Sequence, residues 1–137
     1  MNFKNNLLKV IYKAADKSSS ADLYVFFSQC ILAIQCKNVQ EFNINGKSGL
    51  IEEIKKTHNT STTQNITLVI VARQLSSTFE NQCTKFLTTG NDAYKFSKGC
   101  EFNEYQVPGN MEVFVLTQKG FKHFLGQYNS EALGDFD

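Results

Sequence analysis

An unbroken apolar run, ITLVIVA at residues 66–72, is the feature that most constrains how this chain can fold. Its length is that of a typical strand, and it is rich in β-branched residues, which favour strands. A strand that is apolar on both sides has to be covered on both faces, as parallel strands in α/β proteins are. The run therefore predicts a buried parallel strand.

Two further apolar stretches come earlier in the chain, at residues 23–27 and 31–35, with a turn expected at Ser28 and Gln29. Both are dominated by residue types that are common in strands, so they predict the two strands of a hairpin. The second stretch is apolar on both of its faces. This predicts a central place in the sheet.

The remaining elements are predicted from apolar periodicity and from the order of charges. Ser48 is expected to cap a helix whose acidic residues come early and whose lysines come late, which suits the helix dipole. Residues 90–109 are expected to be irregular. A further strand is expected at residues 111–116, and helices are expected over residues 3–16, 49–58, 76–88 and 118–125. This alternation predicts an α/β layer fold in which helices flank a short mixed sheet.

Length and charge bound the possible functions. The chain has 137 residues, which fits one domain over residues 1–137, with an acidic tail at residues 126–137 that is expected to fray. The net charge is only +1, so any binding of nucleic acid has to use a local basic patch. Arg73 is the only arginine in the sequence, which limits bidentate recognition of phosphate or guanine.

The four cysteines are too widely spaced to form a zinc site, because the sequence has no C-x-x-C pair and no cysteine–histidine cluster. Most of them lie in or beside apolar segments. Four cysteines could form two disulfides, but the favoured interpretation is buried, reduced thiols of an intracellular protein, either cytoplasmic or nuclear. No apolar run approaches about 18 residues, so no membrane partner is expected.

Polar residues stand at the open end of the predicted hairpin. Asp22 opens its first strand, whereas Gln35 and Lys37 close its second strand. Residues two apart on a strand share a face, so Gln35 and Lys37 are expected to point the same way, with Asp22 beside them. Cys36 is expected to point the opposite way, into the core.

These groups suit a hard divalent cation. The Asp22 carboxylate, the Gln35 amide oxygen and the Cys36 backbone carbonyl are the kinds of ligand that Mg²⁺ binds, with water completing its shell. A lysine beside the ion can stabilise developing phosphate charge or orient an attacking water. The arrangement predicts metal-assisted hydrolysis of phosphodiesters, with Asp22, Gln35 and Lys37 as catalytic residues.

The stretch from ADLYVFF to ILAIQCKN resembles the PD-(D/E)xK nuclease superfamily. In that superfamily an acid opens one strand of a hairpin and an acid-x-lysine triplet closes the next. A variant branch writes the triplet Gln-x-Lys, often as QCK. Mrr-like restriction endonucleases, Holliday-junction resolvases and effector nuclease domains of the Crinkler type share this hairpin. The resemblance extends over residues 2–88, through the following helix, the apolar strand and the SSTF start of the next helix.

The resemblance implies a restriction-endonuclease-like fold and an endonuclease that depends on Mg²⁺ or Mn²⁺. The implied partner is DNA, with RNA as an open alternative. Asp22 would be the metal-binding acid, Gln35 the variant second position and Lys37 the catalytic lysine. Enzymes of this kind often cut two strands as dimers, so a homodimer is a further expectation by analogy.

Two departures from the superfamily pattern leave other functions open. Residues 1–40 contain no glutamate, so the first helix offers only Asp16 as an additional acid. Residues 18–21 are also too short for the strand that the superfamily places before the acid-bearing strand. A catalytically inactive module of nuclease fold, which binds nucleic acid or a protein partner, is therefore the main alternative. An unrelated α/β binding or scaffold protein is the third possibility.

Overall fold

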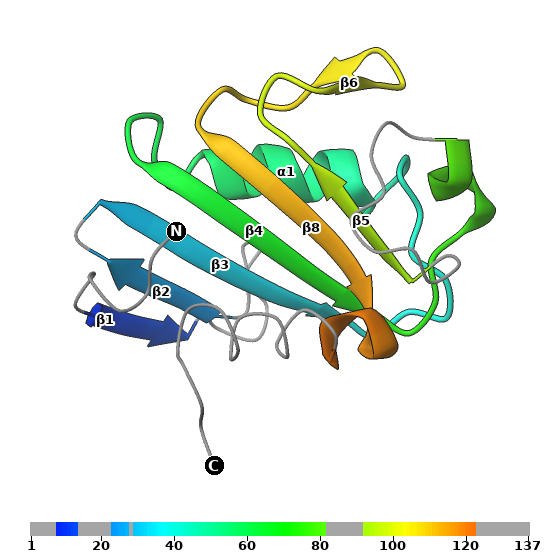
Figure 1. The fold of residues 1–137 in the computed structure, drawn as a ribbon, viewed down its shortest axis with the longest axis horizontal. Coiled ribbons are helices and arrows are strands. Elements are labelled where there is room, and N and C mark those ends of the chain that lie inside the picture. Colours follow the sequence, from blue (N-terminus) through cyan, green and yellow to red (C-terminus); the bar gives the residue numbers. More distant parts are fainter. Residues whose placement is uncertain (1–7, 14–22, 28, 82–91, 123–137) are drawn as a thin grey trace.

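The computed structural model describes residues 8–13, 23–27, 29–81 and 92–122. Within these residues, six strands form one mixed sheet in the order β1-β2-β3-β4-β8-β5 (Figure 1). Their bounds, in that order, are Leu8–Lys13, Leu23–Phe27, Cys30–Lys37, Asn65–Ala72, Met111–Thr117 and Ala93–Phe96. The prediction of an α/β fold around a mixed sheet is therefore confirmed.

The directions of the strands divide the sheet into two parts. β1, β2 and β3 form an antiparallel meander, whereas β3, β4 and β8 run parallel to one another. β5 closes the far edge, antiparallel to β8. The predicted hairpin of residues 23–27 and 31–35 is confirmed, as is the strand predicted at residues 111–116. β3 has the central place that its apolar faces predicted.

β4 is buried on both of its faces. Leu68 and Ile70 pack into one core and Val69 into another, and each of the three is at most 1% exposed. β3 pairs with one edge of β4 and β8 with the other. The prediction of a buried parallel strand at residues 66–72 is therefore confirmed, because such an apolar run is stable only between two covered faces.

The helix α1 (Leu50–His58) covers one face of the sheet and lies behind β4 and β8 in Figure 1. Its Leu50 and Ile54 side chains are fully buried between helix and sheet. The helix predicted over residues 49–58 is confirmed, but its predicted cap is wrong. Ser48 has a φ of 63°, and Gly49 takes the cap position without a side-chain hydrogen bond from the described residues.

Gly49 stands where the loop before α1 passes very close to the helix. A Cβ atom at this position would lie 2.5 Å from the backbone oxygen of Asn45. The Gly49 nitrogen donates to the Gly46 carbonyl at 3.1 Å, and the Leu50 nitrogen donates to the Asn43 carbonyl at 3.0 Å. These contacts fix the direction in which α1 leaves the loop.

Residues 8–13 form a strand, so the helix predicted over residues 3–16 is wrong for its described part. The segment LKVIYK fits either pattern, because its apolar residues at positions 8, 10 and 12 also follow a period of two. Pairing with β2 decides the outcome, and β-branched and aromatic residues favour it. The remaining residues of this predicted helix lie outside the described ones.

The expectation of an irregular segment over residues 90–109 is wrong for Ala93–Phe96, Glu101–Phe102 and Tyr105–Gln106, which form strands, whereas the other described residues of the segment are irregular or in turns. β5 extends the main sheet, and β6 (Glu101–Phe102) pairs with β7 (Tyr105–Gln106) in a small hairpin. The Phe96 and Phe102 rings pack with their centroids 4.7 Å apart, which ties the hairpin to the core. Strands of two to four residues are too short to show a clear alternation of apolar residues.

Two helix predictions are tested only in part. Within the helix predicted over residues 76–88, Ser77–Asn81 forms a 3₁₀-helix, and the residues from 82 onward lie outside the described ones. Within the helix predicted over residues 118–125, residues 118–122 are helical, and the rest, like the acidic tail, lies outside. No helix in the described ranges has the length and apolar character that crossing a membrane requires.

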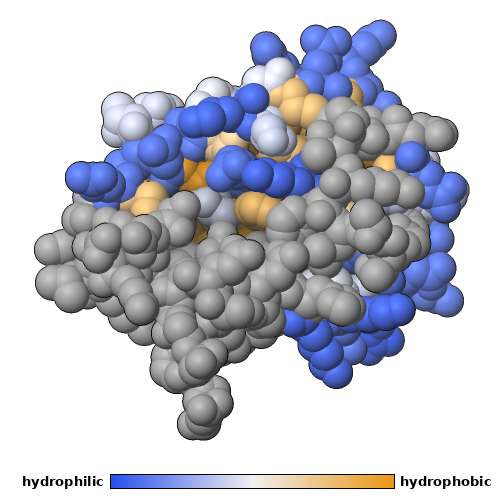
Figure 2. Space-filling view, viewed as in Figure 1, coloured by the Kyte–Doolittle hydropathy of each residue, from blue (hydrophilic) through white to orange (hydrophobic). Residues whose placement is uncertain are grey.

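The sheet has a core on each face. The larger core lies between the sheet and α1, and Figure 1 views the sheet from the opposite side. The smaller core lies on that opposite face and consists of Val69, Ala93, Phe114 and Leu116. Figure 2 shows hydrophobic residues in the middle of this face and hydrophilic residues toward β6. A strand residue is therefore well covered on the α1 side and less completely covered on the other.

The cysteines differ from the expectation of four buried, reduced thiols. Cys100 is disulfide-bonded, whereas Cys30 and Cys36 are reduced. Burial raises the pKa of the Cys30 thiol, but Cys36 is exposed. Cys83 lies outside the described residues. Because stable disulfides are typical of oxidising compartments, the cysteines no longer support the expected intracellular location.

The close contact at Gly49 leads to a prediction about stability. Replacing Gly49 with alanine should lower the free energy of unfolding by about 1–3 kcal/mol, because the new Cβ forces the Asn45 backbone to move. Gly109→Ala is the matched control, since nothing lies within 4 Å of a Cβ at that position. Urea unfolding followed by circular dichroism measures both variants. Equal stability of the two would contradict the tight start of α1.

Candidate functional site

The end of β3 places Gln35 and Lys37 on the face of the sheet that α1 covers. Gln35 is 8% exposed, and the Lys37 side chain is 13% exposed. The two residues lie beside Ile70 and Ala72 of β4 in the parallel register. The structure thus brings the amide and the ammonium onto one face, near the carboxyl end of a parallel strand.

Cys36 faces the other way and is exposed, so the prediction that it points into the core is wrong. The side of the sheet that Cys36 faces carries only the smaller core. The last residues of β3 lie at the end of the strand, where this core no longer covers them. The metal role suggested for Cys36 uses its backbone carbonyl and does not depend on the direction of its side chain.

A buried glutamate of α1 lies against Lys37. The buried face of the helix has the spacing of an amphipathic stripe and consists of Leu50, Glu53, Ile54 and Thr57. Glu53 is 2% exposed. Its Oε1 lies 3.3 Å from the Nζ of Lys37 and 3.6 Å from the Nζ of Lys56. The helix therefore brings a carboxylate to the end of β3.

The two lysines around Glu53 are not equivalent. Lys56 also contacts Glu52, with 3.0 Å between Nζ and Oε1. This hydrogen bond lowers the pKa of the Glu52 carboxyl group and raises the pKa of Lys56. Lys37, in contrast, has Glu53 as its one ionic partner among the described residues. Both of these contacts of Glu53 are made by its Oε1.

Sequence reasoning missed Glu53, although the sequence contains a signal for it. The helix prediction treated Glu53 only as an acidic residue that suits the dipole of the first turns. However, Glu53 falls one turn after Leu50 and next to Ile54, in the apolar stripe that faces the sheet. A glutamate in such a stripe is rarely buried without a partner. That position therefore indicates a cation on the strand that the helix covers.

Gln35 carries a polar atom that the described residues leave without a partner. Its Oε1 is buried and accepts no hydrogen bond from them. Leaving a buried acceptor unsatisfied costs about 1–3 kcal/mol, and native structures contain few such atoms. An amide oxygen is one of the ligands that Mg²⁺ prefers. The donor atoms at this position therefore fit a hard divalent cation.

Charge balance shows what such a cation would still need. Glu52 and Glu53 together carry −2, and Lys37 and Lys56 together carry +2, so the four charges cancel. A divalent ion beside Gln35 then needs a further carboxylate to offset its charge. The sequence assigns that role to Asp22.

Asp22 lies outside the described residues. Leu23, which follows it in the sequence, pairs with Ile34, the residue before Gln35. Within the described residues, no group of three or more histidine, cysteine, aspartate or glutamate side chains is close enough to hold a metal ion. A metal site here therefore depends on Asp22 together with the amide oxygen of Gln35.

No family model matches this chain, and no curated protein matches it either. What the site can do is therefore inferred from its own residues. Its two distinctive features are the QCK triplet at the end of β3 and the buried Glu53 that contacts its lysine.

The buried ion pair leads to a prediction about stability. Glu53→Gln should lower the free energy of unfolding by about 1–3 kcal/mol, because Lys37 then lies under α1 without a charged partner. Glu52→Gln is the matched control on the same helix, and its effect should be much smaller because the Glu52 side chain is 36% exposed, against 3% for Glu53. Urea unfolding at pH 7 compares the two. If both variants lose the same stability, the Lys37–Glu53 pair does not hold β3 and α1 together.

Proposed function

We propose that this protein is a metal-dependent nuclease that hydrolyses phosphodiester bonds of DNA. Asp22, Gln35 and the Cys36 carbonyl would ligate Mg²⁺ or Mn²⁺, and Lys37 would act on the reacting phosphate. One observation carries the proposal. The buried Gln35 oxygen, which has no partner among the described residues, shares a strand face with an ammonium group that a buried carboxylate holds.

The order of elements supports this proposal. The PD-(D/E)xK superfamily, which the sequence resembles, places a helix and then a strand before the acid-bearing strand, and β1 stands where that strand would be. β2 begins one residue after Asp22, and β3 ends on the QCK triplet. α1 and the parallel strand β4 follow. A restriction-endonuclease-like fold is part of the proposal. β1 supplies a strand before the acid-bearing one, but it occupies part of the stretch where the superfamily's first helix was expected, so that helix is now the departure.

The described side chains have distinct parts in the proposed reaction. When bound, the divalent ion supplies Lewis-acid stabilisation of the phosphate and activates a water molecule. The Lys37 ammonium stabilises the charge that develops on the phosphate oxygens. A lysine on its flexible four-carbon stem loses much of its effect if it is not held in place. Glu53 is therefore a positioning residue, which fixes the Lys37 ammonium at the end of β3.

Glu53 also bears on the other departure from the superfamily pattern, the lack of a glutamate in the first helix. The first 40 residues contain no glutamate that could add a carboxylate to the site. In the structure α1 adds one instead, at 3.3 Å from the Lys37 Nζ. This carboxylate pairs with lysines, so it holds Lys37 in place and does not replace the metal-binding acid that the superfamily takes from its first helix.

A catalytically inactive module that binds nucleic acid or a protein partner is the alternative. The same ion pair favours it, because the Lys37 ammonium is already engaged by Glu53 and its side chain is only 13% exposed. A lysine that only neutralises a buried glutamate has a structural role and needs no substrate. Cleavage and metal-binding measurements separate the two functions.

Cleavage of DNA tests the role of Lys37. Wild-type protein should cleave plasmid or linear duplex with Mg²⁺ or Mn²⁺ and not with EDTA, and Lys37→Met should lower the rate by roughly 100-fold or more. The control is Lys95→Met, since Lys95 is a strand lysine that pairs with Glu112 at a distance from the site. The double variant Lys37→Met/Glu53→Gln removes both charges and should stay folded but inactive. Cleavage by Lys37→Met at the wild-type rate would remove Lys37 from the mechanism.

Thermal unfolding with metal tests the role of Gln35. Mn²⁺ should raise the melting temperature of the wild-type protein, because a ligand that binds only the folded state stabilises it. Gln35→Met should abolish this rise without lowering the metal-free melting temperature, since methionine removes a buried acceptor that has no partner in the described residues. Gln29→Met, at an exposed position just before β3, should keep the rise. A rise that survives Gln35→Met would exclude the amide oxygen as a ligand.

A further inference from the structure

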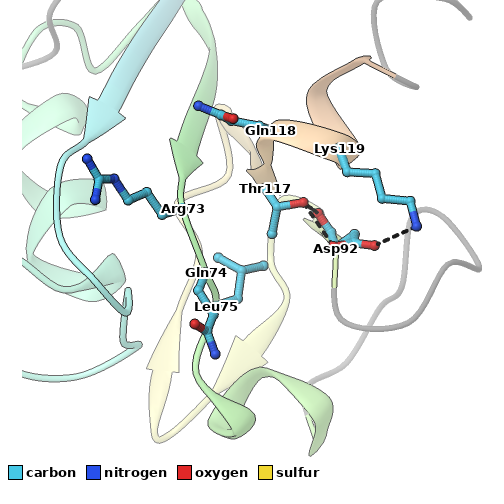
Figure 3. Close-up of a pocket in the computed structure, with 7 residues that line it drawn as sticks. All are labelled: Arg73, Gln74, Leu75, Asp92, Thr117, Gln118 and Lys119. Atoms are coloured by element: carbon cyan, nitrogen blue, oxygen red, sulfur yellow. Dashed lines mark hydrogen bonds and ion pairs between the residues drawn. The ribbon is translucent and has the colours of Figure 1, made fainter.

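A pocket of about 470 Å³ lies at the carboxyl ends of β4 and β8. In open α/β sheets, ligands bind preferentially at this edge. Arg73 and Gln74 follow β4, and Thr117 and Gln118 lie at the end of β8. Figure 3 shows Arg73 extending toward the end of β3, with Lys119 on the other side of Thr117.

The carboxylate that lines this pocket is already engaged. Asp92 Oδ1 accepts a hydrogen bond from the Thr117 hydroxyl at 3.0 Å, and its Oδ2 lies 3.8 Å from the Lys119 Nζ. The Thr117 backbone nitrogen also donates to the Asp92 carbonyl at 2.8 Å. These bonds hold Asp92 against the end of β8. Asp92 is therefore part of the wall of the pocket and does not pair with Arg73.

Arg73 is exposed and makes no ion pair or hydrogen bond with any residue that the structure describes. Its guanidinium group offers several donors in a planar fork that matches the geometry of a phosphate. Lys119 is 68% exposed, and its contact with Asp92 is long. The exposed amides of Gln74 and Gln118 add further donors. The pocket therefore has an excess of donors and positive charge, which suits an anion.

The pocket lies on the same edge of the sheet as Lys37. In the parallel register Lys37 pairs with Ala72, and Ala72 pairs with Thr117. Neighbouring strands are about 4.8 Å apart, so the backbone at Thr117 lies roughly 10 Å from the backbone at Lys37. A polyanion that reaches Lys37 can therefore extend across the ends of β4 and β8. Lys122, which is exposed and one turn after Lys119, continues the basic surface.

We propose that this pocket binds a backbone phosphate of a nucleic-acid strand, next to the phosphate that Lys37 contacts. Arg73 is the bidentate donor to this phosphate, and Lys119, on the other side of Thr117, contacts a neighbouring phosphate of the same strand. The inference rests on the proposed function, because it takes the strand in the pocket to be the strand at Lys37. It adds to that function a phosphate subsite built from the ends of two other strands.

Binding without cleavage tests this subsite. The fluorescence anisotropy of a labelled oligonucleotide is measured against wild-type protein in EDTA, over a range of salt concentrations. Arg73→Gln should weaken binding by about tenfold or more and should reduce the salt slope by about one. Lys95→Gln removes the same charge from a lysine that already pairs with Glu112, and it should weaken binding far less. If the two variants bind equally well, the proposal is overturned.

A second titration, with inorganic phosphate, separates a nucleic-acid strand from a free phosphate ion. The proposal is supported if inorganic phosphate displaces the oligonucleotide only at high concentrations and if oligonucleotide binding depends on Arg73. If inorganic phosphate binds through Arg73 while the affinity for the oligonucleotide is the same in Arg73→Gln, the pocket holds a free anion and the proposal is overturned.

The same measurements separate this inference from the proposed nuclease activity. Oligonucleotide binding that depends on Arg73, in a protein that cleaves nothing with Mg²⁺ or Mn²⁺, contradicts the nuclease and supports the subsite. Cleavage that depends on Lys37, with binding that does not depend on Arg73, supports the nuclease and overturns the subsite.

Discussion

The buried ion pair between Lys37 and Glu53 is the interaction on which the rest of the candidate site depends. Glu53 occupies a position in the apolar stripe of α1, where a leucine or isoleucine would pack against the sheet without any cost of desolvation. Taking a carboxylate and an ammonium out of water costs several kcal/mol for each ion, and their attraction often does no more than offset this cost. Stability alone is therefore a poor explanation for the pair. The proposed function would explain it better, because it requires a lysine at the end of β3 and Glu53 holds that ammonium in place.

The parts of the fold that the sequence predicts are those whose burial leaves a long, regular pattern. β4 needs cover on both faces, so its apolar run predicts both a strand and its central place. α1 shows its apolar stripe and its order of charges over nine residues. β1 is different, because LKVIYK fits a helical period and a strand period equally well, and only pairing with β2 decides between them. β5, β6 and β7 are shorter than any recognisable period, and tertiary contacts such as that between Phe96 and Phe102 define them.

The candidate site also has residues that a regular local pattern predicts and residues that only tertiary contacts bring there. A period of two places Gln35 and Lys37 on one face, and this needs no knowledge of the rest of the chain. The direction of Cys36 depends on which face carries the larger core, and a strand that is apolar on both faces gives no information about that. Glu53 reaches the site, and Arg73 reaches the neighbouring pocket, from elements that lie far from the QCK triplet in sequence. Strand register and helix packing bring them there, so a local motif cannot predict them, although a glutamate within an apolar stripe is a clue.

Whether Lys37 can leave Glu53 for a substrate is what separates a nuclease from a structural module. A phosphate beside Lys37 would compete with the carboxylate of Glu53. The Glu53 side chain is only 3% exposed, and its Oε1 lies 3.3 Å from the Lys37 Nζ. Losing Lys37 would leave Glu53 buried and uncompensated if no other cation were near, and this would oppose the exchange. Lys56 removes that obstacle, because its Nζ lies 3.6 Å from the same Oε1 and its side chain is exposed enough to approach further. Lys56 can also part from Glu52, because the Glu52 side chain is partly exposed and water can solvate its carboxylate. With one buried carboxylate between two lysines, Lys56 would therefore balance the charge of Glu53 if Lys37 shared its ammonium with a phosphate, as the proposed function requires.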